Sequence, residues 1–143
     1  MDQAEAFDQR LLDQLQQGKV VQLAPKGISM TPFIRGDADR VLVRKEDKIE
    51  VGDIVLACWG DKLILHRVYA VNGGRITLMG DGNLDGTEQV DRKDVLATVF
   101  QIVKPSGRCL KPCKAWLWRH TVGCRRIWLK IDRKTKKLLD RQH

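Results

Sequence analysis

The chain contains the stretch Gly27-Ile28-Ser29-Met30-Thr31-Pro32, which is followed closely by Gly36-Asp37. A serine therefore lies in a short loop bounded by glycine and proline. Such a serine is commonly a turn residue that hydrogen-bonds its own backbone. It can also be a nucleophile, because its hydroxyl becomes reactive once a nearby base takes the proton. A second residue is needed to decide between the two.

The candidate base is His66, in Leu65-His66-Arg67-Val68, and it is the only histidine among the first hundred residues. The segment 62–71 has the pattern of a β-strand, in which alternate residues share a face. His66 then lies on the same face as Ile64 and Val68. A neutral imidazole accepts a proton near pH 7. The alternative is a histidine that only packs in the core.

Most of the chain between residues 20 and 103 shows the pattern of short β-strands. The runs are Val20–Leu23, Arg40–Arg44, Ile54–Ala57, Lys62–Val71, Arg75–Met79 and Val95–Val103. Trp59-Gly60-Asp61 and Asn72-Gly73-Gly74 are typical of tight hairpin turns. The sequence therefore predicts a mainly β fold, with a coiled antiparallel sheet or partial barrel.

The ends of the chain differ from this core. Residues 4–17 place Phe7, Leu11 and Leu15 four apart, which predicts a short N-terminal helix with one apolar stripe. Lys104-Pro105-Ser106-Gly107 marks a second boundary. We therefore expect a helical arm over residues 1–19, a β core over 20–103 and a basic helical extension over 104–143.

The motifs occur in an order that resembles the signal peptidase and LexA-like serine peptidase superfamily. The resemblance runs from about residue 20 to 99 and rests on Gly27-x-Ser29-Met30-x-Pro32, Gly36-Asp37, Val51-Gly52-Asp53, His66-Arg67-Val68 and Gly80-Asp81-Gly82-Asn83. Bacterial signal peptidases and LexA-type autoproteases use a lysine as base, whereas endoplasmic-reticulum-type signal peptidases have a histidine there. The chain therefore looks most similar to the serine–histidine branch.

The resemblance implies that Ser29 is the nucleophile and His66 the general base, in a β-rich catalytic core. Met30 and Pro32 shape the serine loop, and the Ser29 backbone N–H is the expected oxyanion donor. Bacterial signal peptidases commonly have a serine hydroxyl two positions before the nucleophile, where this chain has Gly27.

The residue that orients the imidazole is less clear, because two aspartates follow the histidine hairpin. Asp81 matches the Gly-Asp position of the family, and Asp85 lies nearer the usual spacing. Either can instead be a turn aspartate bonded to its own backbone. We favour Asp81 and keep Asp85 as an alternative.

The expected function is a serine endopeptidase that cleaves a peptide or protein substrate and needs no cofactor. The resembled signal peptidases choose small side chains near the cut. Two alternatives stay open: a LexA-like regulator that cleaves itself, and a non-catalytic adaptor that binds peptides on the same scaffold.

The charge of the chain is concentrated in the last third. Residues 1–100 carry 13 Lys and Arg against 16 Asp and Glu, a net −3, whereas residues 101–143 carry 13 against 2, a net +11. A basic helix with tryptophans on one side is typical of binding to an anionic membrane surface. The candidate contact residues are Trp116, Trp118, Arg125, Arg126 and Trp128. A packed helix with a solvated basic face, or a partner protein, would fit the same pattern, and we do not expect nucleic acid as a partner.

The sequence shows neither a signal peptide nor an apolar run long enough to span a bilayer. A cytoplasmic location, with or without membrane association, is therefore expected, and the four cysteines are expected to be reduced. Cys109, Cys113, His120 and Cys124 are soft ligands, but the six-residue gap before His120 is short for a closed zinc site. No metal is expected.

Overall fold

The computed structural model describes residues 3–25, 30, 33–36, 38–80 and 86–112, with side chains described from residue 9 onward. Within these residues the fold is mainly β, as the sequence predicts, with one α-helix that precedes the strands. The elements are α1 (Gln3–Gln16), β1 (Val21–Leu23), β2 (Arg40–Arg44), β3 (Ile54–Trp59), β4 (Lys62–Asn72), β5 (Arg75–Met79), β6 (Glu88–Asp91), the 3-10 turn η1 (Arg92–Asp94), β7 (Val95–Val103) and β8 (Cys109–Leu110). The strands β6 and β8 were not foreseen from the sequence.

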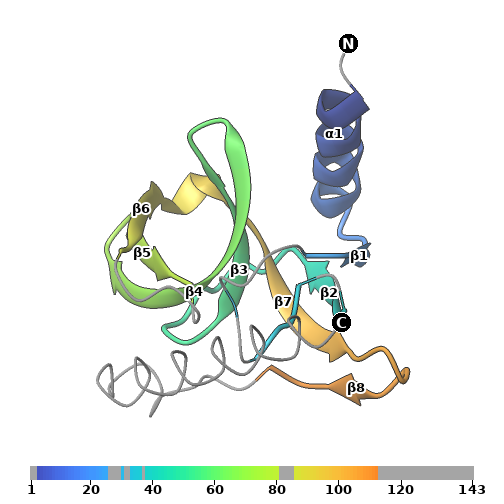
Figure 1. Cartoon of the computed structure of the whole chain (residues 1–143). Coiled ribbons are helices and arrows are strands. Elements are labelled where there is room, and N and C mark those ends of the chain that lie inside the picture. The colour runs from blue at the N-terminus through green and yellow to red at the C-terminus, as the bar shows by residue number, and fades with distance from the viewer. Residues whose placement is uncertain (1–2, 26–29, 31–32, 37, 81–85, 113–143) are drawn as a thin grey trace, which may run out of the picture.

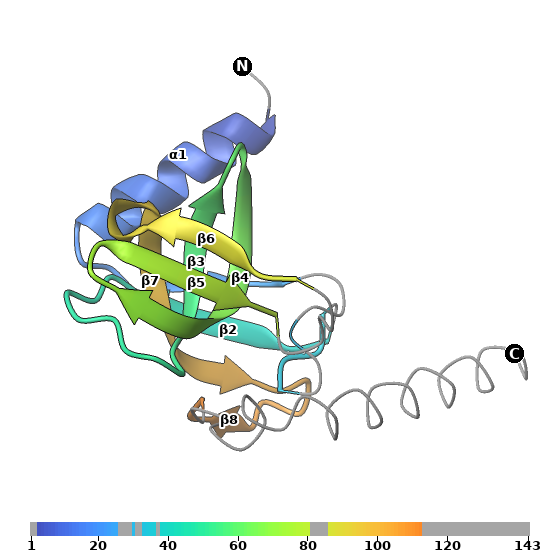
Figure 2. The same cartoon turned by 90° about the vertical axis from the view of Figure 1, so that its left-hand side faces the viewer.

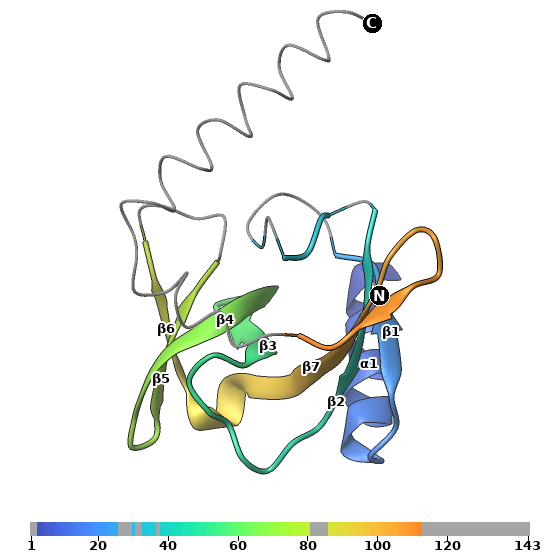
Figure 3. The same cartoon turned by 90° about the horizontal axis from the view of Figure 1, so that it is seen from below.

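The strands form one antiparallel sheet in the order β1-β2-β7-β3-β4-β5-β6, with β8 paired to β7. The sheet is strongly curled, so that β3 to β6 form a half-barrel beside α1, β1 and β2 (Figures 1 and 3). β7 pairs with β2 and with β3, and it therefore joins the two parts of the sheet. The predicted coiled sheet is confirmed.

Two glycine turns set the register of the hairpins around β4. Gly60 (φ 62°) connects β3 to β4 next to the pair Trp59–Lys62, and Gly73 (φ 61°) connects β4 to β5 next to Asn72–Arg75. Residues with a side chain adopt such positive φ values only at a cost. Both turns match the sequence prediction.

The buried apolar side chains form two clusters. The first cluster lies between α1 and the β1-β2-β7-β3 part of the sheet, and it comprises Leu11, Leu15, Met30, Ile34, Val41, Val43, Ile54, Leu56, Ala97, Val99 and Ile102. The second cluster fills the half-barrel and comprises Val55, Ala57, Val68, Ile76, Leu78, Val90 and Val95. Neighbouring residues of β3 divide between them, because successive strand residues point to opposite faces.

The long strand β4 changes partners along its length. It pairs with β3 over residues 62–67 and with β5 over residues 67–72. Among the described residues, the edge of β4 over residues 62–66 that faces away from β3 has no strand partner. His66 lies at the end of this free edge, next to the point where β5 begins to pair.

The helix α1 matches the predicted N-terminal helix to within one residue at each end. Leu11 and Leu15 are buried on the first cluster, as the apolar stripe predicts. Of the predicted basic helical extension over residues 104–143, the described part, residues 104–112, forms a turn and the strand β8 instead of a helix, because residues 109–110 pair with β7. Residues 113–143 lie outside the described residues. In the part of the chain that the structure describes, no helix combines the length and the apolar character needed to cross a membrane.

Candidate active site

His66 is buried on β4, with 7% of its surface exposed. Its Nδ1 atom lies 2.9 Å from Oε2 of Glu88, the first residue of β6. The Glu88 side chain is itself only 12% exposed. A carboxylate at Nδ1 accepts a hydrogen bond from the Nδ1–H tautomer, which leaves Nε2 as the proton acceptor.

The sheet brings these two side chains together across 22 residues of sequence. Glu88 pairs with Leu78 of β5, which pairs with Val68 of β4, so the three residues form a row across the half-barrel. The β4–β5 ladder ends at Arg67–Met79, one residue short of His66. Because no β5 residue pairs with His66, the Glu88 side chain can reach past the end of β5 to the imidazole on β4.

Glu88 was missed by sequence reasoning, because the strand β6 was missed. The four residues Glu88-Gln89-Val90-Asp91 contain only one apolar side chain, Val90, which is buried. Glu88 lies two positions before Val90 and shares its face. That spacing is the signal that an acidic side chain points into the half-barrel.

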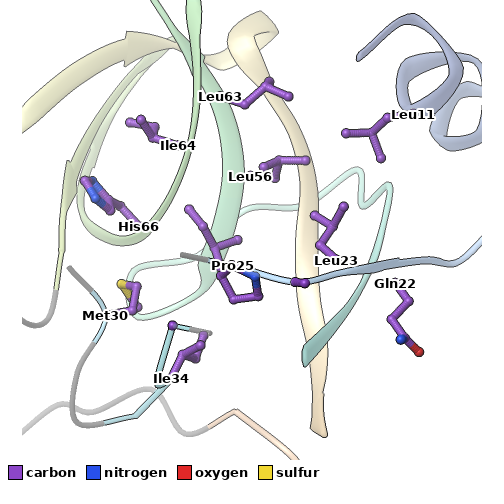
Figure 4. Close-up of a pocket in the computed structure, with 13 residues that line it drawn as sticks. Leu11, Gln22, Leu23, Pro25, Met30, Ile34, Leu56, Leu63, Ile64 and His66 are labelled. Atoms are coloured by element: carbon purple, nitrogen blue, oxygen red, sulfur yellow. The ribbon is translucent and has the colours of Figure 1, made fainter. Parts of the chain in front are cut away.

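A cavity of about 700 Å³ lies beside His66, and Met30 also lines it. Met30 directly follows Ser29 in the chain. Figure 4 shows His66 and Met30 at one end of the cavity and Leu11 of α1 toward the other, with Leu56 and Pro25 between them. The cavity thus joins the predicted base to the residue next to the predicted nucleophile.

The segment after Met30 is fixed by several polar contacts. The Ile34 N–H donates to the Met30 carbonyl at 3.0 Å. The Arg35 N–H donates to the Asp39 carboxylate at 2.8 Å, and Lys104 pairs with the same carboxylate oxygen at 2.7 Å. Because the Asp39 side chain is only 1% exposed, this ion pair anchors the segment to the end of β7.

Arg67, next to His66, connects the same segment to a second loop. It is 1% exposed, and its Nη1 donates to the Gly52 carbonyl at 2.7 Å. Its guanidinium also lies over the ring of Phe33, 5.1 Å from the centroid. A buried guanidinium needs such partners, because burial of an unpaired charge is costly.

Of the predicted site residues, the structure describes His66 and Met30, both of which line the cavity. The others lie outside the described residues: Gly27, Ser29, Pro32, Asp81, Asp85, Trp116, Trp118, Arg125, Arg126 and Trp128. The placement of Ser29 and of the two aspartates stays a prediction.

No group of three or more His, Cys, Asp or Glu side chains suited to a metal ion occurs among the described residues. Of the four soft ligands noted in the sequence, only Cys109 is described, and its thiol is exposed and free. Among the described residues, Gln22 and His66 supply the polar side chains that line the cavity, and the Glu88 carboxylate adjoins the imidazole of His66.

Comparison with known proteins supports a peptidase. A search of curated proteins finds no match. The family model described as Peptidase S24-like matches residues 2–100, which include α1, β1 to β6 and most of β7. This match covers most of the chain and confirms the resemblance to the LexA and signal peptidase superfamily, although not the endoplasmic-reticulum-type branch. The chain belongs to the Peptidase S24-like family, a family of serine peptidases.

Proposed function

We propose that this protein is a serine endopeptidase in which Ser29 is the nucleophile, His66 the general base and Glu88 the residue that orients the base. One observation carries the proposal. His66 is bonded through Nδ1 to a nearly buried carboxylate and lines the same cavity as Met30, the neighbour of Ser29. A base with a fixed tautomer beside a serine loop is the arrangement that serine peptidases need.

In this mechanism the Ser29 hydroxyl attacks the scissile carbonyl carbon while Nε2 of His66 takes its proton. The Ser29 backbone N–H donates to the oxyanion that forms. The imidazolium then gives its proton to the leaving amine, and an acyl-enzyme remains. A water molecule, deprotonated by the same nitrogen, hydrolyses the acyl-enzyme and restores the hydroxyl of Ser29.

Glu88 has two functions in this scheme. Its carboxylate accepts the hydrogen bond from Nδ1–H and so keeps Nε2 free as the acceptor. It also stabilises the imidazolium, because its negative charge lies close to the ring. Asp81 and Asp85 remain candidates for this position alongside Glu88.

The free edge of β4 supports binding of an extended substrate. An extended peptide can add to an exposed strand edge through main-chain hydrogen bonds, with alternate side chains in pockets. The cavity runs along residues 63–66 of β4, at the unpaired edge. A peptide bound there would bring one of its carbonyl groups to His66.

Covalent labelling by a fluorophosphonate probe tests the proposal. The chain has only two serines, Ser29 and Ser106, and Ser106 lies in the exposed turn before β8. We expect the wild-type protein and the Ser106→Ala control to be labelled. Ser29→Ala and His66→Ala should lose labelling and at least about 10³-fold in peptide cleavage. Equal labelling of Ser29→Ala and the parent would exclude this mechanism, and a folded but unlabelled parent would favour a non-catalytic adaptor.

The family match favours one second candidate, a LexA-like regulator that cleaves its own chain. Cleavage within one molecule would then replace cleavage of a separate substrate. The intact mass of the purified protein, followed over days at several concentrations, distinguishes the two. A concentration-independent loss of mass that is absent in Ser29→Ala would establish self-cleavage.

The basic extension over residues 104–143 is proposed to bind an anionic membrane surface. Co-sedimentation with vesicles that contain phosphatidylserine tests this, with the parent compared against Arg125→Glu/Arg126→Glu. We expect the double variant to bind less. Equal binding of both proteins, or binding of neither, would reject the proposal.

A further inference from the structure

The cavity beside His66 is mainly apolar. Its described lining residues are Leu11, Gln22, Leu23, Ala24, Pro25, Met30, Ile34, Gly36, Leu56, Leu63, Ile64, Leu65 and His66. Gln22 and His66 are the only polar side chains in that described lining, and none of it belongs to a permanently charged residue type. A charged substrate side chain would find no charged partner among these described lining residues and would lose part of its hydration.

The size of the cavity exceeds what a small side chain needs. At about 700 Å³ it falls in the range of roughly 300–1,000 Å³ that is usual for ligand pockets. An alanine or glycine in such a space would leave apolar walls without contacts, whereas a branched aliphatic side chain would bury them. The lining therefore fits a larger residue than those that signal peptidases prefer.

The helix α1 supplies part of the wall of the cavity. Leu11 and Leu15 lie one turn apart on α1, and both are buried in the first cluster. Of these two leucines, Leu11 lines the cavity and Leu15 does not. The N-terminal helix therefore contributes to the binding surface itself as well as to the core.

We propose that Leu11 is a specificity-determining residue, and that the cavity accepts a peptide with Val, Ile or Leu at a position near the cleaved bond. This inference rests on the proposed peptidase function, because it assumes that the cleaved bond of a bound peptide lies next to His66 at one end of the cavity. Leu11 closes the apolar space at the helix and limits the size of the accepted side chain, together with Leu63 and Leu65 of β4, which line the same cavity.

The test measures peptide binding without catalysis. The full-length chain with Ser29→Ala is immobilised and exposed to a random decapeptide library, and the bound peptides are sequenced by mass spectrometry. We expect Val, Ile and Leu to be enriched at one position, with Asp, Glu, Lys and Arg depleted there. Adding Leu11→Ala should shift this preference toward Phe and Trp by about tenfold or more, since a single methylene group in an apolar pocket changes discrimination by roughly 10- to 200-fold.

Leu15→Ala is the matched control, because it removes the same atoms from the same helix and the same cluster. It should leave the preference unchanged. Leu63→Ala is a second test of the wall that does not depend on α1, and it should also shift the preference toward larger residues. Because Leu63 is only partly buried, its replacement should lower the free energy of unfolding less than replacement of a buried leucine would.

Three results would overturn the proposal. The first is that no position of the bound peptides is enriched in aliphatic residues. The second is that Leu15→Ala shifts the side-chain preference as much as Leu11→Ala does. The third is that the protein forms a dimer that both Leu11→Ala and Leu63→Ala disrupt, which would mean that a second copy of the chain occupies the cavity. Failure of the peptidase itself is seen separately. If the enriched peptides bind but the parent enzyme with Ser29 neither cleaves them nor reacts with the fluorophosphonate, then the catalytic function is wrong and the binding specificity stands.

Discussion

The two apolar clusters differ in what they enclose. Four buried residues of the first cluster, Leu11, Met30, Ile34 and Leu56, also line the cavity. No buried residue of the second cluster does so, although the His66–Glu88 pair joins β4 to β6 in the half-barrel that this cluster fills (Figure 2 shows these strands). The second cluster fills the half-barrel, whereas the first cluster borders a cavity that His66 and Met30 also line.

The difference separates two physical demands. A general base must be held in one tautomer and orientation, which a close-packed strand face achieves. A binding groove must leave space for a ligand, and its walls therefore lack packing partners on one side. The sheet meets both demands because the His66 ring is held by Glu88 of β6, while residues 63–66 of β4 line the cavity along its free edge.

The largest effect on the rate of cleavage is expected when the carboxylate that orients His66 is lost. Glu88→Gln keeps the shape of the side chain but removes its charge, so the His66 tautomer is no longer fixed. We expect kcat for peptide cleavage to fall by about 10²- to 10⁴-fold, measured against Glu46→Gln as an exposed control. If Asp81→Asn or Asp85→Asn shows this loss while Glu88→Gln does not, then an aspartate is the orienting residue.

Truncation of a buried leucine should destabilise the protein more in the second cluster than beside the cavity. Leu78 is fully buried in the second cluster, so Leu78→Ala should lower the free energy of unfolding by about 3–5 kcal/mol. Leu56→Ala borders an existing cavity and should lose nearer 2 kcal/mol. Urea denaturation measures both. Equal losses would show that the cavity is filled in solution or that the two clusters are packed alike.

Arg67 links the two parts, and its replacement should affect both stability and rate. Arg67→Met keeps the apolar stem but leaves the Gly52 carbonyl without this donor and Phe33 without the guanidinium. We expect a loss of about 1–3 kcal/mol in unfolding free energy and a lower kcat with little change in KM. An unchanged kcat in a destabilised protein would make Arg67 structural only.

Two ion pairs of different burial should differ in their effect, and the exposed pair should give the smallest effect of all. Lys104→Met leaves the nearly buried Asp39 carboxylate without its cation and should cost about 2 kcal/mol. Lys48→Met breaks an exposed pair with Glu50 and should change the unfolding free energy by less than about 0.5 kcal/mol. Thermal and urea unfolding of the two variants measure the difference. If both variants behave alike, Asp39 does not depend on Lys104 for its charge balance.

Much of the fold could be predicted from the sequence, because its signals are local. The apolar runs of β3, β4, β5 and β7 and the two glycine turns each depend on neighbouring residues. β6 was missed because only Val90 in it is apolar, and β8 because it has two residues. Curling and strand order depend on contacts distant in sequence, and local patterns do not encode them directly.

The residues of the candidate site also divide into those that local sequence patterns predict and those that depend on distant contacts. His66 could be selected because it is a lone imidazole in an apolar strand, and Met30 because it adjoins a serine in a Gly/Pro-bounded loop. Glu88 could not, since its role depends on a contact over 22 residues that only the curled sheet creates. The nearer acidic residues, Asp81 and Asp85, were favoured instead because the family resemblance places its carboxylate there.

The central position of β7 has a consequence for synthesis of the protein. Residues 95–103 are made after β2, β3 and β4, yet they are the strand that links β2 to β3. Chains emerge from the ribosome N-terminus first, and pairing of distant strands is slow. The serine loop and the histidine are therefore expected to remain apart on a nascent chain until β7 has emerged. A peptidase built in this way would stay inactive during most of its own translation.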